Sequence, residues 1–293
     1  MPLGSVRKGM LEMFLAYCMW GILPIYWKAL EHVDSVEILC HRVIWSMVAT
    51  CLAVTTLKKW ESISDFIRDD FKGFVSLVIS GFIITLNWGL YIWAVNHGKV
   101  LETSLGYFIN PLITMLFGMM FFHEKLRRVQ LAALLLVVMS VLIEFVTMGM
   151  IPLVSLGLAV TFGFYGVVKK GVHIDSISGL FIETLAVSPF ALYWLYRLQS
   201  RGAASFPYDT FTTLLLITTG IITTIPLILF AMSFKHITLT TAGFIQYTSP
   251  MITFFLGTFV YKETLPPSRL ISFCFIWAAI AIYVADSIRH TQE

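Results

Sequence analysis

The sequence predicts an all-α membrane protein in which ten transmembrane helices form two inverted five-helix repeats. Three observations predict this fold. The chain has 293 residues, of which 58% are hydrophobic and only 13% charged, with a mean hydropathy of +0.83. Ordinary soluble domains carry about 25% charged residues, so too few polar side chains are present to cover a globule in water. Apolar runs recur along the whole chain, and one long motif occurs twice.

The apolar runs predict the helices in order. A helix needs about 20 apolar residues to cross the hydrocarbon core of a bilayer. The first run, 10–28, is long for a signal-peptide core and has no small-residue cleavage site after it, so we expect it to be retained. The ten expected spans lie near 9–30, 36–57, 72–96, 101–122, 129–147, 151–170, 177–197, 210–234, 239–261 and 268–288.

One polar connector in the first half also has helical character. The segment 58–72 separates the second and third spans and places Trp60, Ile63, Phe66 and Ile67 at helical spacing. This pattern predicts a short amphipathic helix that lies on the membrane surface.

Basic residues orient the predicted spans, because cytoplasmic loops of membrane proteins are enriched in Lys and Arg. With a cytoplasmic N-terminus, thirteen basic residues fall on the cytoplasmic side and five on the other, which predicts that both termini are cytoplasmic. The thirteen are Arg7, Lys8, Lys58, Lys59, Arg68, Lys72, Lys125, Arg127, Arg128, Lys169, Lys170, Lys235 and Arg289; the five are Lys99, Arg197, Arg201, Lys262 and Arg269.

An internal repeat divides the chain into residues 1–148 and 149–293. The stretch NPLITMLFGMMFFHEKL, Asn110–Leu126, aligns without a gap to SPMITFFLGTFVYKETL, Ser249–Leu265. These stretches belong to the fourth and ninth spans, so each repeat contains five helices. Since five is odd, the second copy enters the membrane from the opposite side. Inverted repeats of this kind are typical of alternating-access transporters, so we expect a secondary transporter of a small molecule.

Two other classes of function are weighed against transport. A channel or a non-transporting sensor would fit the same spans. An intramembrane enzyme would need a metal-binding motif, paired acids or an activated nucleophile, and the sequence has no HExxH or GxSxG motif. Neither a P-loop nor a CxxC spacing is present, so no cofactor and no metal are predicted. The small, scattered net charge of +3 argues against a nucleic-acid partner.

Equivalent prolines mark the expected centre of the site. Pro111 and Pro250 occupy matching positions in the repeat and are predicted hinges, because proline cannot donate a hydrogen bond to the carbonyl four residues earlier. Free carbonyls at membrane depth are tolerated where they line a cavity. The amides of Asn110 and Gln246 lie beside the two prolines and are predicted to line this cavity.

Aromatic residues deep in the spans are expected to form its walls. Such rings suit a small amphipathic or aromatic solute through apolar contact and hydroxyl or indole hydrogen bonds. Packing without solute contact is the alternative for each ring. The predicted wall residues are Trp20, Trp88, Tyr91, Tyr107, Tyr165 and Tyr247.

Two charges lie within the spans at matching places. Arg42 in the second span and Glu183 in the seventh are 141 residues apart, close to the repeat offset of 139. An unpaired charge in the bilayer is costly, so we expect Arg42 and Glu183 to face the cavity and to neutralise each other, directly or through the solute. The alternatives are a pair between Arg42 and Glu144, or outward snorkelling of Arg42.

The sequence also resembles a known family over essentially its whole length. The stretches EILCHRVIWS, NWGLYIWAVN, LETSLGYFINPL, GLAVTFGFYGVVKK, FIETL and GFIQYTSP are similar to those of the RarD branch of the EamA-type drug/metabolite transporter superfamily. The resemblance implies a multi-pass carrier of the bacterial inner membrane for a metabolite or drug, with export as the expected direction. Members of the RarD branch have a traditional link to chloramphenicol. The oligomeric state is left open.

Overall fold

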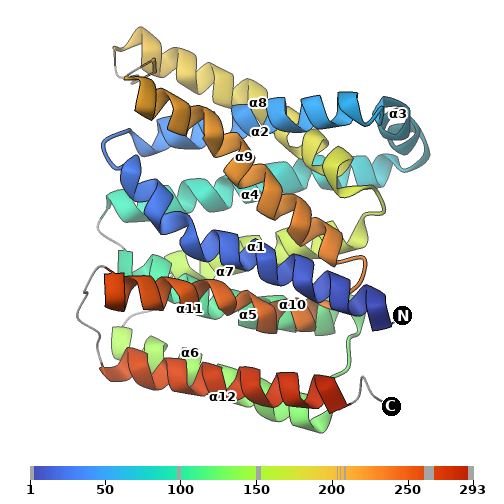
Figure 1. The fold of residues 1–293 in the computed structure, drawn as a ribbon, viewed down its shortest axis with the longest axis vertical. Helices are drawn as coiled ribbons and strands as arrows, with labels where there is room; N and C mark the ends of the chain where they lie inside the picture. The colour runs from blue at the N-terminus through green and yellow to red at the C-terminus, as the bar shows by residue number, and fades with distance from the viewer. Residues whose placement is uncertain are drawn as a thin grey trace.

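A computed structural model describes residues 3–97, 100–149, 153–202, 204, 206–207, 209–260 and 267–289 as a helical bundle without strands. The helices lie side by side, and α1 begins at the same end of the bundle at which α12 ends (Figure 1). The helices are α1 Leu3–Ala29, α2 Ser35–Thr56, α3 Trp60–Asp69, α4 Phe71–Asn96, α5 Val100–Phe122, α6 Arg128–Met148, α7 Leu153–Gly171, α8 Ser176–Ser200, α9 Thr210–Ser233, α10 Leu239–Gln246, α11 Thr248–Phe255 and α12 Pro267–Arg289.

Nine of the described helices are long and apolar enough to cross a membrane. The ninth expected span differs from the prediction because it is divided. Helices α10 and α11 contain eight residues each, and a π-helical turn, Leu256–Val260, follows them. Pro250 lies in the first turn of α11, where its missing N–H leaves no helical hydrogen bond unmade, so the sequence favours a helix start there.

Aspartates fix where three helices begin. The carboxylate of Asp34 accepts hydrogen bonds from the backbone N–H groups of Val36 and Glu37 and so caps α2. Asp175 caps α8 and Asp209 caps α9 in the same way. Such caps satisfy N–H groups that have no partner within the helix. At the junction of the two predicted repeats, α6 ends on Gly149, whose positive φ of 68° suits glycine.

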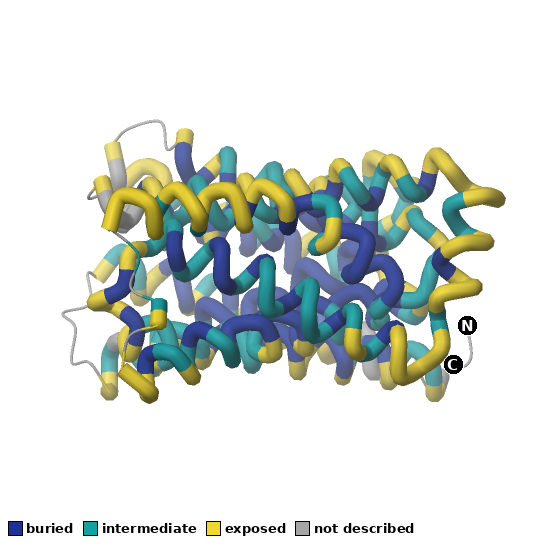
Figure 2. The backbone as a smooth tube through the Cα atoms, turned by 90° about the horizontal axis from the view of Figure 1, so that it is seen from above, coloured by how far each residue is buried: buried dark blue, intermediate teal, exposed yellow. Residues whose placement is uncertain are grey.

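The two halves of the chain are interleaved. Helix α2 packs on α8 and α9, α5 packs on α7 and α10, and α6 packs on α12. The residues with the least exposure therefore lie in the middle of the bundle, between helices from both halves (Figure 2). Neither half has a separate core.

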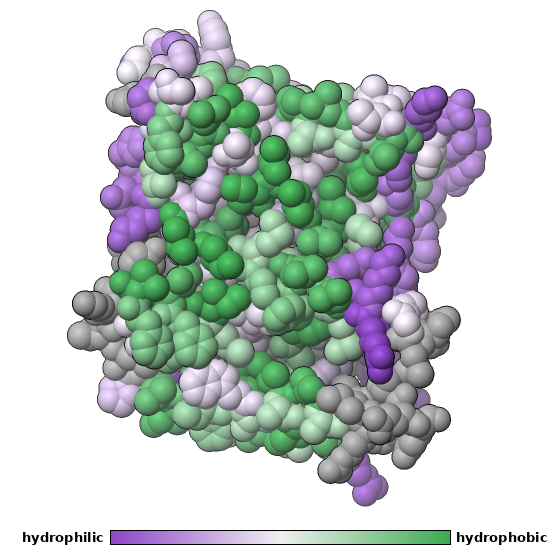
Figure 3. All heavy atoms as spheres, in the orientation of Figure 1, coloured by the Kyte–Doolittle hydropathy of each residue, from purple (hydrophilic) through white to green (hydrophobic). Residues whose placement is uncertain are grey.

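The outer surface of the bundle is largely apolar. Hydrophobic residues spread across the face shown in Figure 3, and hydrophilic residues gather at its left and right edges. Large apolar side chains such as Leu86, Leu153 and Phe190 are more than half exposed on this surface. A soluble protein seldom exposes so much apolar area, whereas a bilayer covers it.

The predicted amphipathic helix is present as α3, but its apolar face is turned toward the bundle. Ile63 is buried, and Phe66 and Ile67 pack beside it against a cluster that includes Leu77 and Phe181. These residues therefore pack within the protein, and the position of α3 on the membrane surface stays a prediction. Helix α3 covers the ends of α2, α4 and α8.

Candidate functional site

A central cavity of about 710 Å³ lies between the two halves of the chain. It extends from the middle of the bundle to Lys28, near the end of α1, and to Arg269, near the start of α12. This end is opposite to the one at which α1 begins. The predicted site residues in its wall are Trp20, Arg42, Trp88, Tyr91, Tyr107, Asn110, Gln246 and Pro250.

Arg42 contacts aromatic rings in the cavity wall. Its guanidinium carbon lies 4.2 Å from the ring centroid of Trp88 and 4.9 Å from that of Trp27. Its Nε donates a hydrogen bond of 3.2 Å to the hydroxyl of Thr223. Each cation–π contact stabilises the charge by about 0.5–2 kcal/mol, which offsets part of its cost within the membrane.

The predicted pairing of Arg42 with Glu183 was wrong. The Glu183 carboxylate instead binds Lys169, with a distance of 3.0 Å from Nζ to Oε1, and both side chains are buried. Ser80 donates to the same carboxylate at 2.8 Å, and the hydroxyl of Tyr165 at 3.3 Å. Lys169 lies in the last turn of α7, and its long side chain reaches back into the bundle, which the depth of the spans alone did not reveal.

Glu144 is not the partner of Arg42 either. It is buried on α6, its Oε1 atom has no hydrogen-bond partner, and it contributes nothing to the wall of the central cavity. Outward snorkelling of Arg42 is also wrong, because its side chain lies against Trp27 and Trp88 at the cavity.

The structure does not bring every predicted wall residue to the cavity. Tyr165 and Tyr247 are fully buried and lie outside its wall, as does Glu183. The Tyr247 hydroxyl donates a hydrogen bond of 2.9 Å to the carbonyl of Phe108. This bond joins the break between α10 and α11 to α5. The two tyrosines therefore connect helices in this structure.

The two prolines have different effects on the helices. Near Pro250 the helix is interrupted between α10 and α11, in line with the predicted hinge. Around Pro111 the helix is continuous from Val100 to Phe122. The role of both prolines as hinges stays a prediction. Helix α5 is supported along its length by α7 and α10, which hold it in helical form despite the proline.

Several polar atoms in the cavity wall have no hydrogen-bond partner. They include Oδ1 of Asn110 and Oε1 of Gln246, the two amides expected at this place. Buried polar atoms without a partner are uncommon in proteins and mark places where a ligand or water binds. The others in this wall are the Tyr17 hydroxyl, the Thr258 hydroxyl and Nε of Arg269.

Some wall residues were missed in the sequence. Trp27 lies next to Lys28 at the end of a span, where aromatic residues usually belong to the membrane interface. Asn87 also lines the cavity, and its amide donates to the Leu158 carbonyl and the Thr161 hydroxyl at 2.8 Å each. A polar amide within an apolar span was a usable signal for Asn87.

Polar contacts join several helices at the end of the bundle where α1 begins. The Glu124 carboxylate accepts hydrogen bonds of 2.8 Å from the backbone N–H groups of Leu239 and Thr240, the first residues of α10. Lys170 binds the same carboxylate at 3.3 Å and donates to the Ile237 carbonyl at 2.9 Å. A carboxylate at a helix N-terminus is favoured by the helix dipole. We call Glu124, Lys170, Leu239 and Thr240 the latch.

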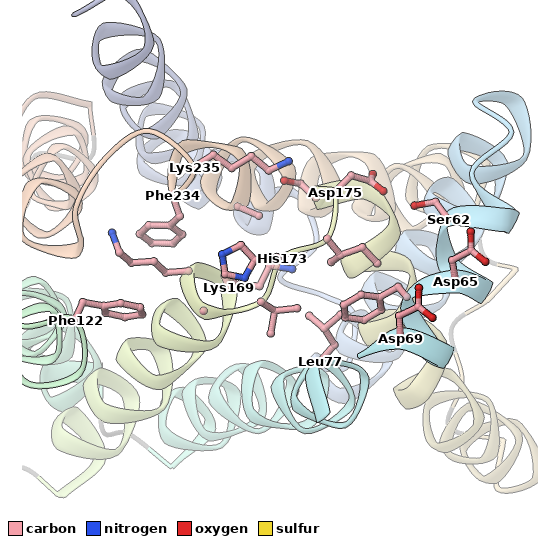
Figure 4. A pocket seen from close by; sticks show the side chains of 17 residues that line it. Ser62, Asp65, Asp69, Leu77, Phe122, Lys169, His173, Asp175, Phe234 and Lys235 are labelled. Carbon is pink, nitrogen blue, oxygen red and sulfur yellow. The ribbon is translucent and has the colours of Figure 1, made fainter. Parts of the chain in front are cut away.

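A second cavity, of about 940 Å³, lies at this end. Figure 4 shows Asp65 and Asp69 of α3 at one side of it and Phe122 at the opposite side, with Lys169 and His173 between them. The ion pair between Lys169 and Glu183 therefore lies at the wall of this second cavity.

Aromatic side chains separate the two cavities. Trp20 and Phe162 line the central cavity, and both rings contact Phe230. Phe230 in turn stacks on Tyr165 and contacts Phe234, which lines the second cavity. We call Trp20, Phe162, Tyr165, Phe230 and Phe234 the aromatic layer.

The fold and the site define a class of protein: a helical membrane protein with a solute-sized cavity between two interleaved halves. The model of the EamA-like transporter family matches the chain twice, over residues 7–146 and 149–285. The chain belongs to this family, as a member of the RarD type. It is therefore a membrane transporter, a multi-pass protein of the bacterial inner membrane whose partners are a small-molecule solute and lipid.

Relatives and a solved structure agree with this assignment. "Protein RarD" of Escherichia coli is 39% identical over 290 residues, covering 99% of this chain and 97% of that protein. "Uncharacterized transporter YojE" of Bacillus subtilis is 40% identical, with coverage of 97% and 96%. "Chloramphenicol-sensitive protein RarD" of Pseudomonas aeruginosa is 30% identical, with coverage of 96% and 95%. A solved structure, described as "Crystal structure of protein", shares the fold at a TM-score of 0.70 and 18% identity, covering 94% of this chain and 96% of that chain.

Proposed function

We propose that the protein is an alternating-access secondary transporter that exports a small amphipathic solute across the inner membrane. In this proposal it performs no chemical conversion. The chain crosses the membrane ten times, with α10 and α11 together forming one crossing, and both termini are cytoplasmic. Residues 1–148 and 149–293 are the two inverted repeats.

The observation that carries the proposal is the pair of cavities on opposite sides of the aromatic layer. The central cavity extends toward one end of the bundle, and the aromatic layer and the latch lie between it and the other end. A carrier needs a solute site that is reached from one side at a time, and this arrangement is what its outward-facing state requires. A channel instead needs a continuous path, which the aromatic layer interrupts.

The contacts between helices support the inverted repeat. The repeat makes α1, α2, α4, α5 and α6 the counterparts of α7, α8, α9, α10 with α11, and α12. Under this exchange the contact of α1 with α9 corresponds to that of α7 with α4, and the contact of α2 with α9 to that of α8 with α4. Both members of each pair are present. The contacts of α2 with α8 and of α6 with α12 correspond to themselves.

The wall of the central cavity supports an amphipathic solute. The rings of Trp20, Trp88 and Tyr107 provide apolar area, and the unpartnered oxygens of Asn110 and Gln246 provide acceptors. Ligand sites commonly combine an apolar wall with a few polar groups and have volumes of about 300–1,000 Å³, and the cavity volume falls within this range.

Counterflow in proteoliposomes tests the proposal. Vesicles are loaded with an unlabelled solute from a panel that includes chloramphenicol and indole derivatives, and uptake of the labelled solute is followed. A carrier should show saturable uptake that is accelerated by solute on the opposite side. Flux that is neither saturable nor accelerated, for every solute that crosses, would indicate a channel. Uptake into right-side-out and inside-out membrane vesicles tests the direction of transport. An exporter should take up the solute faster into inside-out vesicles.

A further inference from the structure

Helices α2 and α8 begin in the same way, which aligns Arg42 with Glu183. Each helix begins at the serine of an Asp-Ser pair, with Asp34 and Asp175 as the capping residues. Arg42 and Glu183 each lie eight residues after the capping aspartate. The two opposite charges therefore occupy the same place in counterpart helices.

The surroundings of the two charges also correspond. Glu183 accepts a hydrogen bond from the Ser80 hydroxyl of α4, and Arg42 donates one to the Thr223 hydroxyl of α9, the counterpart of α4. Each charge also contacts a residue near the C-terminal end of α7 or α1. For Glu183 this residue is Lys169, and for Arg42 it is Trp27.

The sequences of α1 and α7 place these two contact residues at equivalent positions. GILPIYWK, Gly21–Lys28, and GFYGVVKK, Gly163–Lys170, both run from a glycine to a lysine seven residues later. The residue before that lysine is Trp27 in α1 and Lys169 in α7. The second half therefore supplies an opposite charge, and the first half supplies an indole ring.

Arg42 is thus left with its positive charge. An indole ring attracts a cation but does not neutralise it. Among the residues that the structure describes, none brings a carboxylate within 4.0 Å of Arg42. Arg42 lines the central cavity, whereas the Lys169–Glu183 pair is enclosed away from it. An anion within the cavity would complete the arrangement that Lys169 and Glu183 already form in the other half.

We propose that the transported solute carries an anionic group, such as a carboxylate, that binds Arg42, and an aromatic body that lies against Trp27, Trp88 and Tyr107. A guanidinium binds a carboxylate through paired hydrogen bonds and stacks on aromatic rings, so both parts of the solute find partners at one place. This inference rests on the proposed transport function, because it names the chemical class of the solute.

Binding of three related probes to the purified protein tests the charge preference. Indole-3-acetate is the anion, indole-3-acetamide its neutral counterpart and tryptamine the cation. Calorimetry should give a Kd for indole-3-acetate at least about tenfold below those of the other two, because a hydrogen bond to a charged group is stronger by about that factor. Equal Kd values for the anion and the amide would overturn the proposal.

The variant Arg42→Gln tests whether Arg42 causes the preference for the anion. It should bind indole-3-acetate about tenfold or more weakly and lose the preference for the anion over the amide. An unchanged melting temperature should demonstrate that the variant is folded. The matched control is Arg197→Gln, because Arg197 also contacts an aromatic ring, that of Tyr193, but is exposed on α8. This control should bind all three probes as the wild type does. Unchanged anion binding by Arg42→Gln would overturn the assignment.

A variant that introduces a carboxylate next to Arg42 provides an independent test. Trp27→Glu places a carboxylate where the other half has Lys169, so Arg42 would be neutralised within the chain. This variant should lose the preference for indole-3-acetate over the amide, and Trp27→Phe should keep it. An anion preference that persists in Trp27→Glu would contradict the proposal.

The proposed transport function and the anion preference can fail separately. Anion-selective binding without counterflow would remove the transport function and keep the Arg42 site. Saturable counterflow that favours neutral or cationic solutes would keep the transport function and remove the anion site.

Discussion

At the scale of single residues, the buried ion pair of Lys169 and Glu183 is predicted to stabilise the fold, and neither residue lines the central cavity. Replacing one member leaves the other as an unpaired buried charge, so Lys169→Met and Glu183→Gln should each lower the free energy of unfolding by roughly 3 kcal/mol. The double variant should lose less than the sum of the two, because it leaves no charge unpaired. Unfolding by SDS in mixed micelles measures all three values.

The exposed pair of Arg68 and Asp65 on α3 is the control for this cycle. Its atoms are 2.9 Å apart, but both side chains are largely exposed, so its replacement should leave the free energy of unfolding nearly unchanged. Additive effects of Lys169→Met and Glu183→Gln would mean that the two side chains do not stabilise each other.

The two amides of the central cavity permit a second residue-scale prediction. Asn110→Ala and Gln246→Ala each remove an acceptor that has no partner within the protein. Each variant should therefore weaken solute binding by about two- to tenfold without loss of stability, since no internal hydrogen bond is broken. Calorimetric titration with indole-3-acetamide measures the Kd.

A matched amide lies outside the cavity. Gln199 is exposed near the end of α8, so Gln199→Ala should leave binding unchanged. If Asn110→Ala and Gln246→Ala also bind the probe with unchanged affinity, the polar part of the solute lies elsewhere in the cavity.

Some of these residue-scale features could be predicted from the sequence. Amides and charges within apolar spans are conspicuous because each is costly there, and this signal identified Arg42, Asn110 and Gln246. Pairing could not be predicted, because equal depth does not determine which helices are neighbours. Lys169 is near the end of a span, and only the packing of α4 against both α7 and α8 brings its amine to Glu183.

At the scale of helices, close packing depends on glycines at particular crossings. A Cβ atom on Gly81 would lie 2.6 Å from the backbone oxygen of Glu183, so Gly81→Ala should force α4 away from α8. The melting temperature should fall by several degrees. Gly89→Ala in the same helix is the control, because the nearest atom to its Cβ, in Leu39, is 3.9 Å away. Equal melting temperatures for the two variants would contradict this view of the crossing.

The junction between α3 and α8 predicts a dependence on pH. Burial alone would raise the pKa of Asp175, but hydrogen bonds from Lys59 and Ser178 outweigh it, and the pKa lies below its ordinary value. The folded protein therefore binds this proton less tightly than the unfolded chain does. The stabilisation is complete above about pH 4 and is lost as the pH falls through the lowered pKa.

Asp175→Asn measures this contribution. The wild type should lose more stability than Asp175→Asn between pH 5 and pH 3, by about 1 kcal/mol or less because the pair is partly exposed. Glu61→Gln, at an exposed position on α3, should behave as the wild type does. Parallel pH profiles for the wild type and Asp175→Asn would exclude a contribution from Asp175.

The helices also show which structural features could be predicted from the sequence. Apolar length predicted nine of the spans as single helices, and capping aspartates mark several starts. Proline had opposite outcomes in α5 and in α10 with α11, although the two motifs align. Whether a proline interrupts a helix depends on how neighbouring helices pack around it, and that packing could not be predicted from the sequence.

At the scale of the whole molecule, the central cavity depends on how the two halves of the chain pack together. Two five-helix units predicted from sequence do not form two bodies, because helices from one half fill the spaces between helices of the other. The central cavity is a result of this interleaving, since its wall combines Arg42 and Asn110 of the first half with Phe162 and Gln246 of the second. In the proposed alternating-access cycle, a reversal of the access side would require an exchange of contacts between counterpart helices.

In the proposed transport cycle, the latch is the contact that this exchange would break. Glu124 holds the start of α10 through two backbone hydrogen bonds and binds Lys170 of α7. Glu124→Gln removes the negative charge and one of the acceptor oxygens. Since hydrogen bonds to a charged group are worth about 1.5–3 kcal/mol, the population should shift by about tenfold or more toward a state that is open at the latch end.

Labelling of a cysteine at position 246 reports this shift. In a background without Cys18, Cys40, Cys51 and Cys274, an impermeant thiol reagent should reach Gln246→Cys mainly from the periplasmic side. The central cavity extends toward the end opposite the latch, and the proposed cytoplasmic termini place that end in the periplasm. Adding Glu124→Gln should reduce labelling in spheroplasts and increase it in inside-out vesicles. Glu61→Gln should change neither. If Glu124→Gln leaves the ratio between the two sides unchanged while the protein stays folded, the latch does not control access to the central cavity.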